Sequence, residues 1–291
     1  MKKLPRKMGA QTVKLRRLQT LYTFFIAVGL LIMASSSYYL VDSEIEYASA
    51  RSEYSQLREL RPVMIPERDV IPHIDYTGYF PGTNIADGQS MQDTHDDAAG
   101  SGAVSYLHPS PIHLEPEPPD PLAGLSGINP DFIGWIVIGD LIDYPVVRGR
   151  DNSHYLDTTF SGQRNASGAI FMDYSNDLGF DGTVTILYGH NMKDGSMFSS
   201  LHRYRDRAYI IENPLVKILT ADGELLFYNI FDARITYVEN RDADLGLSDG
   251  AAAAGPFRGA PSGSSRFLVL STCTNSANND ERLRVYAALI E

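Results

Sequence analysis

The sequence predicts a mainly β domain, built as a barrel or a sandwich, outside the cytoplasm and behind a single membrane-spanning helix. The stretch from residue 18 to residue 41 contains no charged residue, as expected for a membrane helix. From residue 128 onward, short β-branched and aromatic runs follow one another between turn residues, with few long helical patterns. Many short strands at such spacing are typical of all-β architectures.

The first 41 residues have the composition of a membrane anchor. Residues 1–17 contain no acidic residue and seven cations, Lys2, Lys3, Arg6, Lys7, Lys14, Arg16 and Arg17. As a helix, residues 18–41 are about 36 Å long at about 1.5 Å per residue, enough to cross a hydrocarbon layer of about 30 Å. Cations before this run and acids after it predict a cytoplasmic segment 1–17, a single-pass anchor 18–41 in the cell membrane and an extracytoplasmic remainder.

A cleaved signal peptide is the competing interpretation of the N-terminus. Its cleavage site would be Ala48-Ser49-Ala50. That site lies well beyond the apolar run and past three acids, so an uncleaved anchor is favoured.

The net charge argues against nucleic-acid binding, and the cysteine content excludes an internal disulfide. The net charge is −11, and beyond residue 17 the chain carries 18 basic residues against 36 acidic ones. Such a domain is a poor partner for nucleic acid, because that binding depends on cationic contacts to phosphate. A single cysteine, Cys273, cannot form an internal disulfide. The free thiol is therefore either incidental or reactive.

Two segments separate the anchor from the β domain. Residues 42–61 contain no Gly or Pro and are expected to continue the membrane helix outward. Residues 62–126 are rich in Pro, Gly, Asp, Ser and His, which predicts a mostly disordered spacer. It contains four histidines, His73, His95, His108 and His113. Their spacing matches no metal-ligand motif, so no metal site is expected there. We expect a domain starting at Gly127 to be as stable as one starting at Ser43.

The predicted folded domain, residues 127–291, is long enough for one substantial core. Its strand-like runs are 132–138, 142–147, 168–172, 183–188, 209–211, 215–219, 224–230, 233–238, 267–273 and 282–290. Helical turns fit residues 152–156 and 197–204, and Trp135 is predicted to be a core residue. The connection 238–266 is rich in Ala, Gly, Pro and Ser, and long loops inside compact domains are often functional.

Three side chains are candidates for acyl-transfer chemistry. Cys273 ends one strand-like run, His190 follows another, and Arg282 opens the last one. A base or a cation activates a thiol as a nucleophile, and an arginine can hold a carbonyl or an oxyanion. Taken alone, an unpaired cysteine is more often a small buried apolar residue. The spacing by itself therefore allows such a site without establishing it.

The Cys-bearing strand Leu270-Ser-Thr-Cys273, followed by Arg282, resembles the signature of sortases, the membrane-anchored cysteine transpeptidases of Gram-positive bacteria. Upstream blocks are similar to class B sortases in particular: 128–135, 142–147, 151–156, 167–173, 188–192, Met197-Phe198 and Leu201. The similarity covers residues 128–290 in order. It implies an eight-stranded sortase-type β-barrel with short peripheral helices.

The resemblance also implies roles for single residues. Cys273 is similar to the family nucleophile, His190 to the general acid/base, and Arg282 to the arginine that binds the substrate carbonyl and the oxyanion. Arg284 lies on the same side of the strand, but the number of residues after the cysteine favours Arg282. Four residues are similar to residues that line the substrate groove in relatives: Asn152, Leu156, Ser271 and Thr272. No cofactor and no metal are implied.

The activity implied by the resemblance is a two-step acyl transfer. Cys273 attacks the threonine carbonyl of a C-terminal sorting signal, of the Asn-Pro-Xaa-Thr type, on a surface protein. An amine of a peptidoglycan precursor or of a pilin then resolves the thioester. The segment before the Cys strand carries a helix in class B relatives, and its different composition here leaves the substrate motif open. A hydrolysing thiol peptidase and a catalytically silent wall-binding or pilus-scaffold module are the alternatives.

Overall fold

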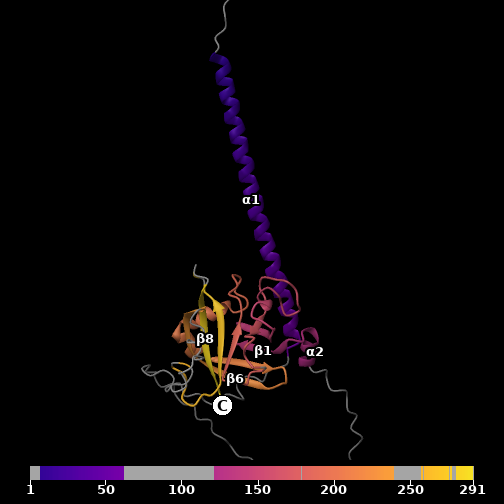
Figure 1. The fold of residues 1–291 in the computed structure, drawn as a ribbon, viewed down its shortest axis with the longest axis vertical. Helices are drawn as coiled ribbons and strands as arrows, with labels where there is room; N and C mark the ends of the chain where they lie inside the picture. The colour runs from indigo at the N-terminus through magenta and orange to yellow at the C-terminus, as the bar shows by residue number, and fades with distance from the viewer. Residues whose placement is uncertain are drawn as a thin grey trace, which may run out of the picture.

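Eight strands close into a β-barrel, and one long helix reaches it from the N-terminus (Figure 1). The computed structural model describes residues 7–61, 121–177, 179–238, 257, 259–274, 276 and 280–290. In chain order the elements are α1 (Lys7–Glu59), α2 (Pro121–Ile128), β1 (Phe132–Ile138), β2 (Ile142–Val147), η3 (His154–Leu156), β3 (Ile170–Met172), β4 (Val184–Tyr188), η4 (Ser199–Arg205), α3 (Arg207–Glu212), β5 (Leu215–Thr220), β6 (Leu225–Tyr237), β7 (Phe267–Cys273) and β8 (Glu281–Leu289). Neighbouring strands follow the order β1-β2-β3-β4-β7-β8-β6-β5, which confirms the mainly β, eight-stranded barrel.

Alternation along the strands divides the apolar side chains between two cores. In β7, Leu268 and Leu270 belong to the main core, whereas Phe267 and Val269 belong to a smaller core on the opposite face. Phe257, from the connection before β7, covers that smaller core and stacks edge-on against Phe267 with ring centroids 5.2 Å apart. Trp135 is fully buried, as predicted.

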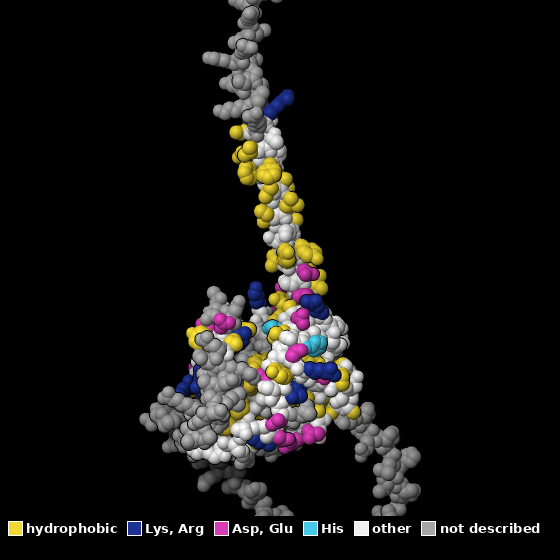
Figure 2. Space-filling view, viewed as in Figure 1, with side chains coloured by type: hydrophobic (Ala, Val, Ile, Leu, Met, Phe, Trp, Pro, Cys, Tyr) yellow, Lys and Arg dark blue, Asp and Glu magenta, His cyan; other side chains and the backbone are white. Residues whose placement is uncertain are grey.

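Helix α1 changes character along its length. The part of α1 from Leu18 onward contains an 18-residue window of mean hydropathy 1.9. None of this window is buried by the protein, so this part of the helix is a candidate membrane span. Figure 2 shows the apolar side chains around this part and acidic ones nearer the barrel. Further along, Ala50, Tyr54 and Leu57 are at most 5% exposed and belong to the main core. The same helix therefore carries an exposed apolar segment and a segment packed on the barrel.

A domain starting at Gly127, expected to be as stable as one starting at Ser43, lacks part of the main core. It omits the α1 residues in the core and also α2, whose Leu122 and Leu125 are 8% and 0% exposed. Helix α2 occupies the last residues of the predicted spacer 62–126, because Pro121 suits a first helical position and the two leucines share one face. The rest of the predicted spacer lies outside the described residues, with its four histidines.

Two further predictions of local structure need correction. The run 209–211 is not a strand, because it lies in α3, where Asp206 caps the helix by accepting from the amide N–H of Ala208 at 2.9 Å. The runs 224–230 and 233–238 form the single strand β6, with an irregularity of register between Ile230 and Asp232. In the connection 238–266, residues 239–256 and 258 lie outside the described residues.

Docking of α1 predicts a difference between two leucines three residues apart. Leu57 is 5% exposed and Leu60 is 43% exposed. Leu57→Ala should lower the free energy of unfolding by about 2–5 kcal/mol, the range for large-to-small core substitutions. Leu60→Ala should change it by no more than about 0.5 kcal/mol. Chemical denaturation of the two variants checks this, and equal small effects would show that α1 does not belong to the core.

Candidate active site

Three strand ends meet where the predicted catalytic residues lie. β4 and β7 are parallel, with Tyr188 beside Ser271, and the ladder is extended by the Gly189 N–H, which donates to the Ser271 carbonyl at 3.2 Å. β7 and β8 are antiparallel, with Cys273 directly opposite Arg282. His190 follows the end of β4 by two residues. The pairing therefore brings a thiol, an imidazole and a guanidinium to one end of the barrel.

Strand alternation also places these side chains on one face. Leu270 and Leu283 belong to the main core, so their sequence neighbours Ser271 and Arg282 face the other way. Cys273 follows Ser271 by two residues and shares its face. The reactive groups thus lie on the outer face of β7 and β8, next to the smaller core.

A cavity of about 300 Å³ opens at this place. All seven residues predicted from the sequence line it: Asn152, Leu156, His190, Ser271, Thr272, Cys273 and Arg282. Five further residues complete the lining, namely Phe171, Tyr188, Gly189, Val238 and Arg284. Sequence reasoning singled out only Arg284 among these five, because apolar or aromatic residues in strands have the same composition whether they face a core or a pocket.

His190 is held from two sides. Its Nε2 lies 2.7 Å from the carbonyl oxygen of Leu156, and its own carbonyl accepts from the Phe198 N–H at 2.9 Å. Because a carbonyl can only accept, Nε2 carries the proton, and Nδ1 is the acceptor nitrogen of the neutral ring. Gly189 permits this close packing, since a Cβ there would lie 2.7 Å from the Phe198 ring. Leu156, predicted as a groove residue, thus also orients the histidine through its main chain.

The turn that carries Leu156 is fixed by its own hydrogen bonds. Asp151 accepts from the Ser153 hydroxyl at 2.7 Å and from the His154 N–H at 2.8 Å, and these bonds lower the pKa of the Asp151 carboxyl to about 2. Tyr155 anchors the turn to the barrel, because its hydroxyl donates to Asp131 at 2.9 Å. Burial raises the pKa of this tyrosine to about 12. The Leu156 carbonyl is therefore presented to His190 by a constrained turn.

Cys273 is exposed and its thiol is free. Within the described residues, the thiol and the His190 ring form no hydrogen bond with each other; such bonds are often long until substrate binds. The Cys273 carbonyl lies 3.1 Å from Nε2 of His202 in η4. His202 thus donates to the end of β7, a contact that no motif in the sequence indicated.

The register separates the two candidate arginines. Arg282 is opposite Cys273, partly exposed, and donates from Nη1 to the carbonyl of Glu281 at 2.9 Å. Arg284 is opposite Ser271, two residue pairs further along the strand, and is only 4% exposed. The arginine paired with Cys273 across the two strands is therefore Arg282.

The remaining predicted residues, Asn152 and Thr272, differ in their hydrogen bonding and in the direction of their side chains. The Asn152 amide is partly committed, because Nδ2 donates to Asp173 at 3.1 Å and Oδ1 accepts from the Tyr174 N–H at 3.0 Å. The Tyr188 hydroxyl donates to the same buried carboxylate at 2.7 Å. Thr272 alternates toward the main core and is 2% exposed, in contrast to Cys273 beside it.

In the described part of the chain, no group of three or more His, Cys, Asp or Glu side chains is arranged to hold a metal ion. The cavity brings together a thiol, an imidazole and a guanidinium. Groups of these three kinds can support cysteine-dependent acyl transfer.

Comparison with known proteins identifies the family. The sortase-domain family model matches residues 138–290, just over half of the chain. The chain therefore belongs to the sortase family, and the relatives it matches are class B members.

Three relatives illustrate the similarity. Sortase B of Listeria monocytogenes is 36% identical over 140 residues, which are 48% of this chain and 56% of that protein. The chain thus spans little more than half the length of that curated relative. The crystal structure of Clostridium perfringens sortase B is 27% identical with a TM-score of 0.51, covering 58% of this chain and 99% of that one. A Streptococcus pyogenes class B sortase involved in pilus biogenesis is 27% identical with a TM-score of 0.50, covering 58% and 97%.

Proposed function

We propose that the protein is a cysteine transpeptidase that cleaves a sorting signal and transfers the preceding protein to an amine. The observation that carries the proposal is the shared cavity of Cys273, His190 and Arg282, with the cysteine and the arginine paired across two strands. Membership of the sortase family supports it. The sorting signal is of the Asn-Pro-Xaa-Thr type, and the acceptor is an amine of a peptidoglycan precursor or of a pilin.

The first step forms a thioester. The Cys273 thiol passes its proton to Nδ1 of His190, and the sulfur attacks the threonine carbonyl. Arg282 donates hydrogen bonds to the oxygen as it becomes an oxyanion, which favours the transition state over the ground state. As the C–N bond breaks, the imidazolium returns the proton to the leaving amine. The hydrogen bond from Nε2 to the Leu156 carbonyl keeps the ring oriented through both transfers.

The second step reverses these roles with a new amine. The incoming amine attacks the thioester carbonyl, His190 accepts its proton, and the thiol leaves with that proton. Holding the thioester beside a bound amine gives this attack a high effective concentration relative to free reactants. The site can therefore ligate peptides although its parts are those of a thiol peptidase.

We further propose that α1 anchors the enzyme in the cell membrane as a single span, with the N-terminus in the cytoplasm. The exposed apolar stretch beginning at Leu18 and the cations before it support this topology. The cavity and the barrel are then extracytoplasmic.

The choice between transfer and hydrolysis can be tested with a peptide of the Asn-Pro-Xaa-Thr type. Wild-type protein with an added primary amine should give mainly the ligated product, measured by mass spectrometry. Cys273→Ala should abolish turnover, because the chain has no other cysteine. His190→Ala should lower kcat/KM by at least about 10²–10⁴-fold, the usual worth of proton transfer. A purely hydrolytic product at saturating amine would identify a thiol peptidase instead.

The two arginines provide a matched pair of conservative changes. Arg282→Lys keeps the charge but loses the planar fork of donors, so kcat/KM should fall by about 10²-fold or more, as for a missing oxyanion donor. Arg284→Lys should have a much smaller effect on kcat/KM per folded molecule, because Arg284 is paired with Ser271 rather than with the nucleophile. Circular dichroism of both variants controls for folding, since Arg284 is buried. A larger kinetic loss for Arg284→Lys would reverse the assignment.

A further inference from the structure

Helix α1 connects the candidate membrane span to the barrel without a break. The junction Val41-Asp-Ser-Glu-Ile-Glu46 contains no Gly or Pro and is helical throughout. Among the described residues, the hydrogen bonds between this helix and the barrel domain start at Glu46, whose carbonyl accepts from Nδ2 of Asn165 at 2.9 Å. Because the helix is continuous and its far end is packed on the barrel, the position of the membrane span sets the position of the barrel.

Further contacts follow along the same helix in order. Arg51 forms an ion pair with Asp194 at 3.4 Å, and the Tyr54 hydroxyl donates to the Gly168 carbonyl at 2.6 Å. Nearer the helix end, Nε of Arg58 donates to the Asp143 carbonyl at 2.9 Å. Asp194 lies only four residues after His190. The helix therefore contacts the loop that begins at the proposed general acid/base.

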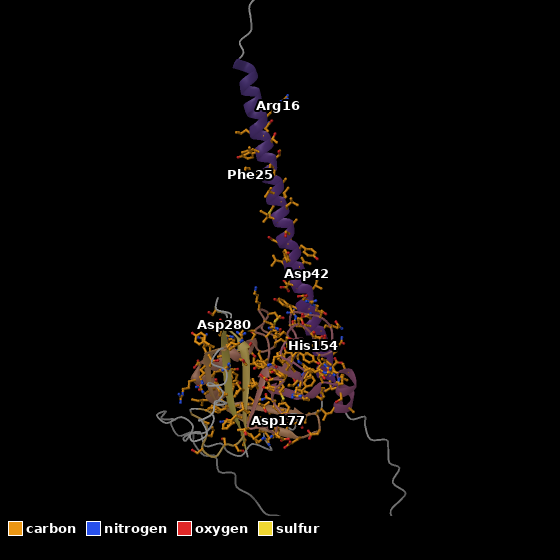
Figure 3. All side chains as sticks on the ribbon, viewed as in Figure 1. Arg16, Phe25, Asp42, His154, Asp177 and Asp280 are labelled. Atoms are coloured by element: carbon orange, nitrogen blue, oxygen red, sulfur yellow. The ribbon has the colours of Figure 1, made fainter. Side chains whose placement is uncertain are left out.

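The cavity lies at the end of the barrel from which α1 departs. Figure 3 shows Asp280, which precedes β8, at this end, and Asp177, which precedes β4, at the opposite end. β8 therefore starts at the α1 end, and the parallel strands β4 and β7 finish there. Their last residues carry His190 and Cys273.

The height of the cavity end of the barrel above the bilayer follows from the helix rise per residue. Tyr38 and Tyr39 are about 70% exposed and mark the outer membrane interface, where tyrosine is enriched. Glu46 is five residues beyond Val41, the last residue of the uncharged run. At about 1.5 Å per residue, these five residues span about 7.5 Å. Each headgroup layer is about 5–8 Å thick. The hydrogen bond at Glu46 therefore lies at the outer edge of the headgroups.

We infer that the cavity end of the barrel faces the outer surface of the bilayer, and that α1 is a rigid strut that fixes its distance from the lipid headgroups. The inference rests on the proposed membrane anchoring. Its partner is the bilayer surface itself, and the cavity receives chains and amines presented there. The connection 62–120 joins α1 to α2, and both helices pack on the barrel. The link from the candidate membrane span to the barrel therefore runs through α1 itself, although the sequence alone suggested a spacer between them.

The single cysteine allows a test that does not depend on activity. The full chain is reconstituted in phosphatidylcholine and phosphatidylglycerol vesicles, and Cys273 is labelled from outside with a membrane-impermeant fluorophore. Energy transfer to acceptors on the lipid headgroups reports the distance of the site from the bilayer. A helical heptad inserted between Ser43 and Glu44 should raise this distance by about 10 Å while turning the domain by only about 20°.

The matched control is a heptad of Gly and Ser inserted between Gly100 and Ser101, within the connection 62–120. It should leave the energy transfer unchanged, because α1 already joins the membrane span to the barrel without a break. If the energy transfer falls with the Gly100 insertion and not with the Ser43 insertion, α1 does not set the distance of the barrel from the bilayer and the inference is wrong.

A second measurement separates this inference from the proposed chemistry. In cells, the Ser43 insertion should lower transfer of a membrane-anchored substrate by at least about tenfold, whereas the Gly100 insertion should not. Detergent-solubilised forms of both should cleave a soluble peptide as the parent does. If the parent cleaves no peptide, the proposed activity fails while the energy transfer still decides the inference. Unchanged cellular transfer with the Ser43 insertion would contradict a fixed working height.

Discussion

The parallel pairing of β4 with β7 is the constraint on which the site depends. It sets Tyr188 beside Ser271, and so brings His190 to the same edge as Cys273. The antiparallel partner β8 then supplies Arg282 opposite the cysteine. Because side chains alternate along a strand, a slip of one residue would turn Cys273 toward the main core and Leu270 toward the cavity. Burial of Leu268 and Leu270 therefore stabilises the catalytic register as well as the fold.

The second constraint is the docking of α1. Buried residues of this helix complete the main core, and hydrogen bonds from Tyr54 and Arg58 fix its position against the barrel. The same packed segment contacts the loop that begins at His190 and adjoins the anchor proposed for the membrane. Stability, site geometry and placement at the membrane are thus coupled through one helix.

Much of the site could be predicted from the sequence because its residues end strands with clear patterns. Leu270-Ser-Thr-Cys273 ends a buried strand, and His190 ends another, so their meeting needed only the pairing of those strands. The resemblance favoured Arg282 over Arg284, but the pairing of Arg282 with Cys273 depends on the strand register, which a single sequence does not contain. The contact from His202 to the Cys273 carbonyl also gave no signal, because an isolated histidine in a polar turn carries no pattern.

Other errors arose where composition hid tertiary packing. Residues 209–211 have a strand-like composition, yet the cap at Asp206 starts a helix there. Composition predicted a helix for 42–61 but a spacer for 121–126, which is part of α2. In neither segment did it indicate the burial of Tyr54 and Leu125, which depends on the distant barrel. Local sequence reports propensity, whereas a core shared between remote segments is set by the whole fold.

The central claim is that the meeting of these strand ends makes Cys273 the acyl carrier. It is tested most directly by intact-mass analysis of the full chain with a sorting-signal peptide and no added amine. The account predicts a mass increase equal to the acyl fragment ending in threonine, carried by Cys273 and released by hydroxylamine, as a thioester requires. Peptide cleavage with the adduct on another residue, or cleavage that persists in Cys273→Ala, would contradict it.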